Sequence, residues 1–375
     1  MQQTEYSHRS LIFGRRSTDL LVVASRNGQA LAKPTDNLSF YFYDPTKRRP
    51  IWCLGFWFYR IFLTSSVPRE FRTLVTLTKI LSVRGILATD AYKTLADAEN
   101  YLGSARLFWV QHGVFFGHHI SSLEVVPLSR QSRITLFAIS PHDVENYQRF
   151  GIVPGRIIPT GSLQNCAYLS EANPMSTRQP YRYDICLVLR TVRISEHEHL
   201  NQTIKQTIRK FLEDFNQYCK IRKPRVVIAL SPNSGGSSHR ESLQWMREFF
   251  QHDFDVTESR DQFATYRAVD SANLTIGTHS TVLVEALSRG RKILSFNYSN
   301  LSFLDLPSTG FSHLNSPSYE ILCERIDALL PMSWDTYWSK TPKELKGLTV
   351  DEPGGTISTI NKVLRAELQG ARDLH

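Results

Sequence analysis

The sequence has few cysteines and no long apolar run. Its five cysteines are an odd number, and no two of them stand at C-x-x-C spacing. This argues against a disulfide framework and against a cysteine-bound zinc site. The longest apolar stretch, residues 51–63, is interrupted by Arg60 and is too short to cross a bilayer. Residues 1–16 are too polar for a signal peptide, so we expect a cytoplasmic protein with reduced thiols.

Several common active-site motifs are also missing. The sequence contains no G-x-G-x-x-G, no P-loop with its lysine and no G-x-S-x-G. These absences count against a dehydrogenase, an ATPase and a hydrolase with a nucleophile elbow. Histidine and cysteine do not occur at a familiar metal-ligand spacing either. We therefore expect no metal site and no cofactor.

Acidic residues are fewer than basic ones, and the chain carries a formal net charge of +9. A basic balance favours acidic partners such as nucleic acids, anionic membranes or phosphorylated substrates. Lysine and arginine are spread along the chain without a nucleic-acid-binding module, so we expect no nucleic-acid partner. The aromatic residues within 51–63 raise the hypothesis of a peripheral contact with the anionic inner face of the cytoplasmic membrane, although burial in the core is the simpler interpretation.

The chain contains two rounds of alternating apolar strands and amphipathic helices. Such alternation predicts parallel sheets flanked by helices. Residues 170–181 are polar, contain two prolines and show no periodicity, which is typical of a linker. We therefore expect an α/β protein with two Rossmann-like domains facing a cleft, in residues 1–170 and 182–350, and a C-terminal helix in 351–375.

The most informative stretch runs from Tyr266 to Asn297. It predicts a short buried strand that breaks at Gly277, a helix that ends at Gly290, and a second strand. Between the first strand and the helix lie hydroxyl and imidazole side chains, at Thr278, His279, Ser280 and Thr281. The start of a helix binds anions, because its N–H groups and its dipole both face the ligand.

Glu285 follows one turn inside this predicted helix. A carboxylate there can accept hydrogen bonds from the two hydroxyls of a ribose. Together with the hydroxyl cluster, it predicts a site for the phosphate and ribose of a nucleotide. A capped helix of an ordinary α/β protein is the alternative interpretation. Lys292, further along, is expected to pair at the surface.

A second candidate site follows the strand predicted at 106–110. Gln111, His112 and Gly113 lie just past it, where open α/β sheets bind ligands. Glycine lets the backbone approach a ligand, and a neutral histidine can take a proton from a hydroxyl group. His112 is therefore a candidate base, unless its ring is only hydrogen-bonded within a turn. Asp90, after the preceding strand, is a second candidate that the sequence does not rank against it.

Other polar residues are predicted at the same edges of the two sheets. Gly161 and Ser162 come at the end of the first domain and are expected to face the cleft. Arg190 follows a strand of the second domain, where its guanidinium can clamp a phosphate. Ser231 and Asn233 lie in the loop after the next strand. A tight turn or an ordinary surface residue is the alternative at these positions.

These residues also carry a resemblance to a known family. The hydroxyl cluster, the glutamate within an E-A-L-x-x-G helix and the apolar strand after it resemble the donor half of GT-B glycosyltransferases. The segment is most similar to bacterial surface-carbohydrate biosynthesis proteins, through Tyr266, Ala268, Asp270, Ser280, Thr281, Glu285, Gly290 and Lys292. It departs from their pattern at Ala272 and Asn273, where Ser-Asp is usual. The resemblance covers most of the chain from Asp90 onward, including the Gln-His-Gly triplet.

The resemblance implies a GT-B-like, metal-independent glycosyltransferase that makes a bacterial cell-surface polysaccharide or lipopolysaccharide. Its donor is a nucleotide-activated sugar, which is a co-substrate and binds the second domain. Phosphate is expected on Thr278, Ser280 and Thr281, and ribose on Glu285. The acceptor, a glycan or a lipid-linked glycan, is expected on the first domain beside the base. GT-B folds often return their last helix to the first domain, and we expect the same here.

Other functions stay open. The chain resembles polyol-phosphate transferases as well, which use a cytidine-diphosphate-polyol donor, and His112 and His279 would then be the working pair. A non-catalytic GT-B-like protein that binds a glycan is a second alternative. A third alternative, a protein that binds polynucleotides, is supported by the net charge of +9 alone. The sequence specifies neither the sugar nor the linkage, the stereochemical outcome or the oligomeric state.

Overall fold

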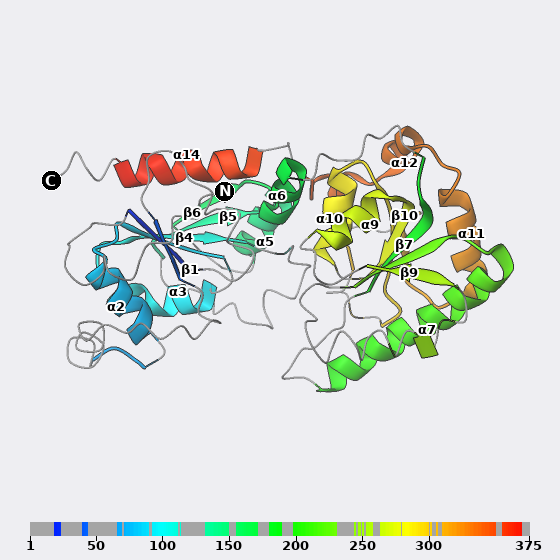
Figure 1. Cartoon of the computed structure of the whole chain (residues 1–375), viewed down its shortest axis with the longest axis horizontal. Coiled ribbons are helices and arrows are strands. Elements are labelled where there is room, and N and C mark those ends of the chain that lie inside the picture. The colour runs from blue at the N-terminus through cyan, green and yellow to red at the C-terminus, as the bar shows by residue number, and fades with distance from the viewer. Residues whose placement is uncertain are drawn as a thin grey trace.

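The structure is a computed structural model in which two parallel sheets are the centres of two domains (Figure 1). It describes residues 19–23, 40–43, 66–69, 71–89, 92–111, 113, 132–149, 155–171, 180–189, 198–230, 244, 247–248, 250, 253–257, 263–278, 280–299, 301, 305–306, 310–349 and 355–369. Within these ranges, no helix is both long and apolar enough to cross a membrane.

The first sheet has six parallel strands in the order β2-β1-β3-β4-β5-β6. Their bounds are β1 Leu20–Val23, β2 Phe40–Tyr43, β3 Gly85–Ala88, β4 Arg106–Val110, β5 Ile134–Ala138 and β6 Arg156–Pro159. Every residue of β1, β3 and β5 is buried. A parallel sheet covered on both faces hides both sets of alternating side chains, which is why short, continuous apolar runs form its strands.

Helices cover both faces of this sheet. One face carries α2 (Arg72–Ile80), α3 (Tyr92–Ala98), the 3-10 helix η4 (Glu99–Tyr101) and α5 (Pro141–Arg149). The other face carries α6 (Leu163–Glu171) and the last helix of the chain, α14 (Gly355–Gln369). Ile360, Leu364 and Leu368 of α14 are buried against the sheet. Figure 1 shows α14 on the opposite side of the sheet from α2 and α3, so the chain returns to its first domain.

The second sheet also has six parallel strands, in the order β12-β11-β10-β7-β8-β9. Their bounds are β7 Tyr183–Leu189, β8 Val226–Leu230, β9 Phe254–Val256, β10 Ala272–Gly277, β11 Lys292–Phe296 and β12 His313–Leu314. The helices around them are α7 Glu198–Arg222, α9 Ala264–Asp270, α10 Thr281–Ser288, α11 Tyr319–Leu329, α12 Trp334–Lys340 and α13 Lys343–Lys346. The prediction of an α/β protein with two Rossmann-like domains is confirmed.

Each sheet contains one place where the strand order reverses direction. In the second sheet it lies between β7 and β10, and in the first between β1 and β3. Loops that leave the carboxyl ends of two such strands diverge to opposite faces, which opens the place where α/β sheets bind ligands. The reversal in the second sheet is next to Gly277, at the end of β10. A Cβ at this glycine would lie 2.8 Å from the Val188 carbonyl oxygen, so the close approach of β7 requires glycine.

Lys292 differs from its prediction, because it is buried rather than paired at the surface. Only 4% of the residue is exposed. Its Nζ donates to the carbonyls of Leu329, Leu330 and Met332 at 2.7, 2.9 and 2.7 Å. A cation at the end of α11 is favoured by the helix dipole. Burial lowers the pKa of Lys292 to about 8.

This burial predicts that stability rises with pH. In the unfolded chain Lys292 has its ordinary pKa of 10.5, so between pH 8 and 10.5 the unfolded state binds more protons and folding becomes more favourable. From pH 7 to 9, the free energy of unfolding of the wild type should gain about 1 kcal/mol relative to Lys292→Met, at about 1.4 kcal/mol per pKa unit. Urea unfolding at both pH values measures this difference. Lys340→Met controls for loss of an exposed lysine, and a pH-independent difference for Lys292→Met would contradict the account.

Candidate functional site

Helix α10 begins where the sequence predicts an anion site. The extended residue before it, Ser280, is its N-cap, yet the Ser280 side chain makes no capping hydrogen bond. Thr278 is 3% exposed, and its hydroxyl has no hydrogen-bond partner in the part of the chain that the structure describes. Buried hydroxyls normally have a partner. The turn from β10 into α10 therefore carries hydrogen-bonding capacity that the described fold does not use.

The first domain reaches this turn through the segment after β4. A Cβ added to Gly113 would lie 3.3 Å from Oγ1 of Thr281, the first residue of α10. The Gln-His-Gly triplet and the hydroxyl cluster lie far apart in the sequence and were predicted separately. The structure brings Gly113 of one beside Thr281 of the other, where a Cβ at residue 113 would fit only tightly.

Gln111 holds the backbone of this segment in place. Its side chain is fully buried. Its Nε2 donates to the carbonyl of Gly113 at 2.7 Å and to Oδ1 of Asp143 at 3.0 Å. Its Oε1 accepts from the backbone N–H of Ile139 at 3.2 Å. The nitrogen and the oxygen of the Gln111 amide are therefore both hydrogen-bonded, and the direction of the Gly113 carbonyl is fixed from within the first domain.

Asp143 connects Gln111 to the start of α5. The sequence Ser140-Pro141-His142-Asp143 forms a capping box. The Asp143 backbone N–H donates to Ser140 Oγ at 3.1 Å, while the Asp143 carboxylate accepts from the Ser140 N–H at 3.0 Å and from its hydroxyl at 2.6 Å. Gln111 is thus bonded to the capped start of α5. This contact helps to hold the segment at Gly113 at a defined distance from α10.

Glu285 lies in the junction between the two domains. It is 3% exposed. Its Oε1 accepts a short hydrogen bond from Ser162 Oγ, and its Oε2 accepts from the Tyr266 hydroxyl at 2.9 Å. Ser162 is the N-cap of α6, where its Oγ also accepts from the Asn165 N–H at 3.3 Å. Gly161, directly before it, has a φ of 95°, a conformation that favours glycine.

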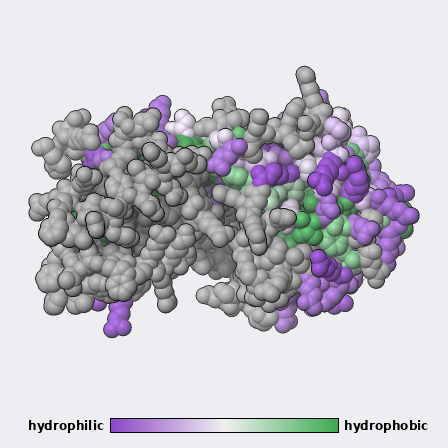
Figure 2. Space-filling model, in the orientation of Figure 1, coloured by the Kyte–Doolittle hydropathy of each residue, from purple (hydrophilic) through white to green (hydrophobic). Residues whose placement is uncertain are grey.

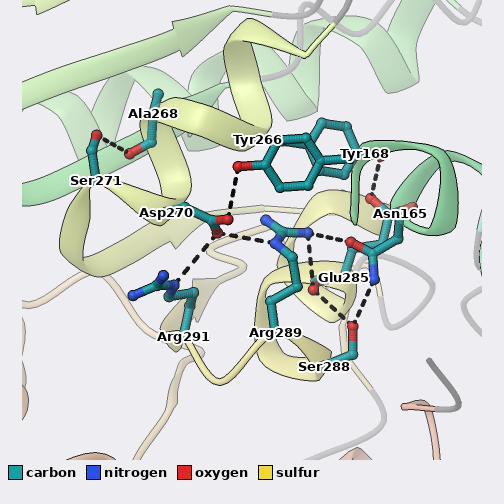
Figure 3. A network of polar contacts seen from close by, with 10 residues as sticks. All are labelled: Asn165, Tyr168, Tyr266, Ala268, Asp270, Ser271, Glu285, Ser288, Arg289 and Arg291. Carbon is teal, nitrogen blue, oxygen red and sulfur yellow. Dashed lines mark hydrogen bonds and ion pairs between the residues drawn. The ribbon is translucent and has the colours of Figure 1, made fainter. Parts of the chain in front are cut away.

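Further polar contacts join α6 of the first domain to the end of α10 (Figure 3). Asn165 Nδ2 donates to Ser288 Oγ at 3.1 Å, and Asn165 Oδ1 accepts from Nη1 of Arg289. The Tyr168 hydroxyl donates to Oδ2 of Asp270 at 2.9 Å. Burial, together with the charge of Asp270, raises the pKa of Tyr168 above its usual range, so this hydroxyl keeps its proton and stays a donor.

Arg289 is the central cation of this junction. Its Nε lies 3.0 Å from Oδ1 of Asp270, and Nε of Arg291 lies 3.5 Å from the same oxygen. The Arg289 guanidinium carbon is 5.2 Å from the ring centre of Tyr168 and 4.9 Å from that of Tyr266. Stacking of this kind suits arginine, which is planar and more weakly hydrated than lysine. One arginine thus contacts an aromatic ring from each domain.

Several predicted site residues lie outside the described residues: His112, Asp90, Arg190, Ser231, Asn233 and His279. The strands that precede all six are described and end at Ala88, Val110, Leu189, Leu230 and Gly277. The roles proposed for these side chains stay predictions. Among the described site residues, Gly113, Thr281, Thr278 and Ser280 belong to one region, and Gly161, Ser162 and Glu285 to the adjoining junction.

Sequence reasoning missed the residues that organise the site. Tyr266 and Asp270 were noted only as matches to a pattern, and Tyr168 and Arg289 were not considered. Aromatic and charged residues at these positions give no local signal, because their partners come from other elements and, for Tyr168, from the other domain. A D-x-D triplet, Asp253-Phe254-Asp255, was also overlooked. It lies on the edge strand β9, where the Asp255 carboxylate accepts from the Tyr183 hydroxyl and from Arg182.

The Gln111 network predicts a specific pattern of stabilities. Gln111→Glu places a second buried carboxylate against Asp143 and a carbonyl, so it should cost about 2–4 kcal/mol of the free energy of unfolding. Adding Asp143→Asn restores a donor and an acceptor between the two side chains and should recover about half of the loss. Urea unfolding of both single variants and of the double variant tests this. Additive losses would show that the two side chains do not interact.

A comparison with models of protein families finds a match in the second domain. A family model described as "putative O-antigen biosynthesis protein" matches residues 182–319, which contain the second sheet and α10. This match spans less than half of the chain. No curated protein sequence matches this chain.

Solved structures resemble the whole chain. The structure of S. aureus MnaA with UDP has a TM-score of 0.59 at 10% identity, covering 94% of this chain and 97% of that one. UDP-GlcNAc 2-epimerase from Neisseria meningitidis, bound to UDP-GlcNAc, has a TM-score of 0.56 at 13% identity and covers 92% and 98%. The wall teichoic acid polymerase TagF has 0.55 at 10% identity and covers 96% and 91%. The fold of this chain is therefore the GT-B arrangement of two Rossmann-like domains.

Proposed function

We propose that this protein is a glycosyltransferase that moves a sugar from a nucleotide-activated donor to a growing bacterial surface polysaccharide or lipopolysaccharide. The observation that carries the proposal is the approach of Gly113 to Thr281 at the start of α10. A donor bound at α10 would have its reactive end directed at the segment of the first domain that carries His112. The contact of Gly113 with Thr281 thus brings the acceptor side of the first domain next to the donor side of the second, as a transfer reaction requires.

The donor site is built from α10 and its approach. The N–H groups at the start of the helix point toward this side, and together with the helix dipole they favour a diphosphate there. The buried Thr278 hydroxyl, which has no partner in the described part of the chain, adds a hydrogen bond. Glu285 would bind the ribose. Within the proposal, His279, Arg190, Ser231 and Asn233 complete the donor side.

The reaction would need a base and a site for the leaving group. A hydroxyl of the acceptor attacks the anomeric carbon of the donor sugar, and the bond from that carbon to the diphosphate oxygen breaks. His112 or Asp90 takes the proton of the attacking hydroxyl. Negative charge grows on the departing diphosphate, and the start of α10 stabilises it without a metal ion. The net charge of +9 suits a phosphorylated donor.

Support for the surface-carbohydrate assignment comes from the second domain, where the O-antigen family model matches. We place the reaction in the cytoplasm at the inner membrane face, with a glycan or a lipid-linked glycan as acceptor. The likeness to TagF favours a second candidate, a polyol-phosphate transferase with a cytidine-diphosphate-polyol donor. The likeness to epimerases shows that the same fold also serves reactions without an acceptor.

A thermal-shift panel with CMP, CDP, UDP, GDP and dTDP tests the proposal. A nucleotide at one hundred times its dissociation constant should stabilise the wild type by about 2.7 kcal/mol. Glu285→Gln keeps the size of the side chain but loses its charge, so it should remove most of this shift. Glu324→Gln, at an exposed position of α11, is the matched control and should keep it.

The outcome also separates the candidates. Stabilisation by a uridine, guanosine or thymidine diphosphate supports sugar transfer, whereas stabilisation by CDP or CMP alone favours polyol-phosphate transfer. Turnover of the matching nucleotide sugar only in the presence of a glycan acceptor distinguishes transfer from epimerisation. No shift with any nucleotide would count against a donor site at α10.

A further inference from the structure

The carboxylate proposed to bind ribose is already engaged in the domain junction. Glu285 is 3% exposed, and each of its oxygens accepts a hydrogen bond, one from Ser162 and one from Tyr266. The vicinal hydroxyls of a ribose would donate to the same two oxygens. A carboxylate can accept about four hydrogen bonds in principle, but at this burial a ribose cannot reach the oxygens while Ser162 and Tyr266 both donate to them.

The two donors differ in how firmly they are held. The ring of Tyr266 lies 5.1 Å from that of Tyr168 and 5.9 Å from that of Phe263, measured between ring centres. The Arg289 guanidinium stacks on it as well. Moving Tyr266 would therefore disturb several contacts. Ser162 has a small side chain, it comes from the other domain, and a rotation about one bond removes its hydroxyl from Glu285.

We propose that Ser162, a residue of the first domain, competes with the donor ribose for Glu285 and thereby sets the affinity for the nucleotide. The inference rests on the proposed function. Binding of the ribose displaces the Ser162 hydroxyl from the carboxylate of Glu285. By thermodynamic linkage, the Ser162 contact weakens nucleotide binding by the same factor by which the nucleotide weakens that contact.

The displacement is local, because other contacts keep the junction closed. Asn165 remains bonded to Ser288 and Arg289, and Tyr168 remains bonded to Asp270 (Figure 3). None of these bonds involves the carboxylate of Glu285. The domains therefore need not separate when the Ser162 hydroxyl leaves Glu285. A variant of Asn165 alters the same junction without affecting the competition between Ser162 and the ribose.

The test measures nucleotide affinity by calorimetry in the full-length chain. Ser162→Ala should bind the ribonucleotide that the wild type binds best (UDP, CDP or GDP) about tenfold more tightly, because the ligand no longer displaces a hydrogen bond to a charged group. The same variant should unfold at a lower temperature, because α6 loses its N-cap. A purely structural role of Ser162 would lower both stability and affinity, so the opposite signs are diagnostic.

Three controls make the result specific. The 2′,3′-dideoxy form of the same nucleotide lacks the competing hydroxyls, so Ser162→Ala should not improve its binding. Ser162→Thr retains the hydroxyl and should bind like the wild type. Asn165→Ala keeps the Ser162 contact with Glu285 and should show no gain in affinity for the ribonucleotide.

Two results would overturn the inference while leaving the proposed function intact. One is unchanged or weaker binding of the ribonucleotide to Ser162→Ala. The other is an equal gain for the ribonucleotide and its dideoxy form. If no nucleotide of the thermal-shift panel binds the wild type or Ser162→Ala, the donor site itself fails, and the inference fails with it.

Discussion

A buried ion pair holds helix α10 between the two domains, and the rest of the site depends on that position. Arg289, directly after the helix, pairs with Asp270 at 3.0 Å, and their side chains are 3% and 1% exposed. Loss of Asp270 would leave Arg289 and Arg291 without their carboxylate, and breaking a buried pair of this kind costs on the order of 3–5 kcal/mol. Tyr168 of the first domain also bonds Asp270, so the pair fixes α10 relative to both sheets.

The C-terminal end of α10 is held by this ion pair, and its N-terminal end faces the first domain. Gly113 approaches Thr281 there, and the buried Gln111 amide holds the Gly113 carbonyl from the other side. Helix α6 and its N-cap contact the second domain through directional hydrogen bonds, from Ser162 to Glu285 and from Tyr168 to Asp270, and through apolar packing of Tyr168 on Phe263 and Tyr266. Buried hydrogen bonds of this kind favour one arrangement of the two domains. On the face that Figure 2 shows, the described residues of the second domain present both polar and apolar side chains.

The sequence predicted the fold better than the site. Short apolar runs such as Ile134–Ala138 and Lys292–Phe296 form the expected strands, because a parallel sheet buries both faces and its pattern is local. The contact of Ser162 with Glu285 spans 123 positions, and no local pattern indicates which serine of one domain meets which carboxylate of the other. Lys292 was wrongly expected at the surface for the same reason, since its carbonyl partners belong to the end of a later helix.

The measurement that tests the account most directly is a crystal structure with the nucleotide that binds best. The account predicts diphosphate oxygens within hydrogen-bond distance of the Thr278 hydroxyl and of the first N–H groups of α10, with both ribose hydroxyls on Glu285. It also predicts that the first domain faces the diphosphate through the segment that contains Gly113. A nucleotide bound at the carboxyl ends of the first sheet, or a diphosphate remote from α10, would contradict it.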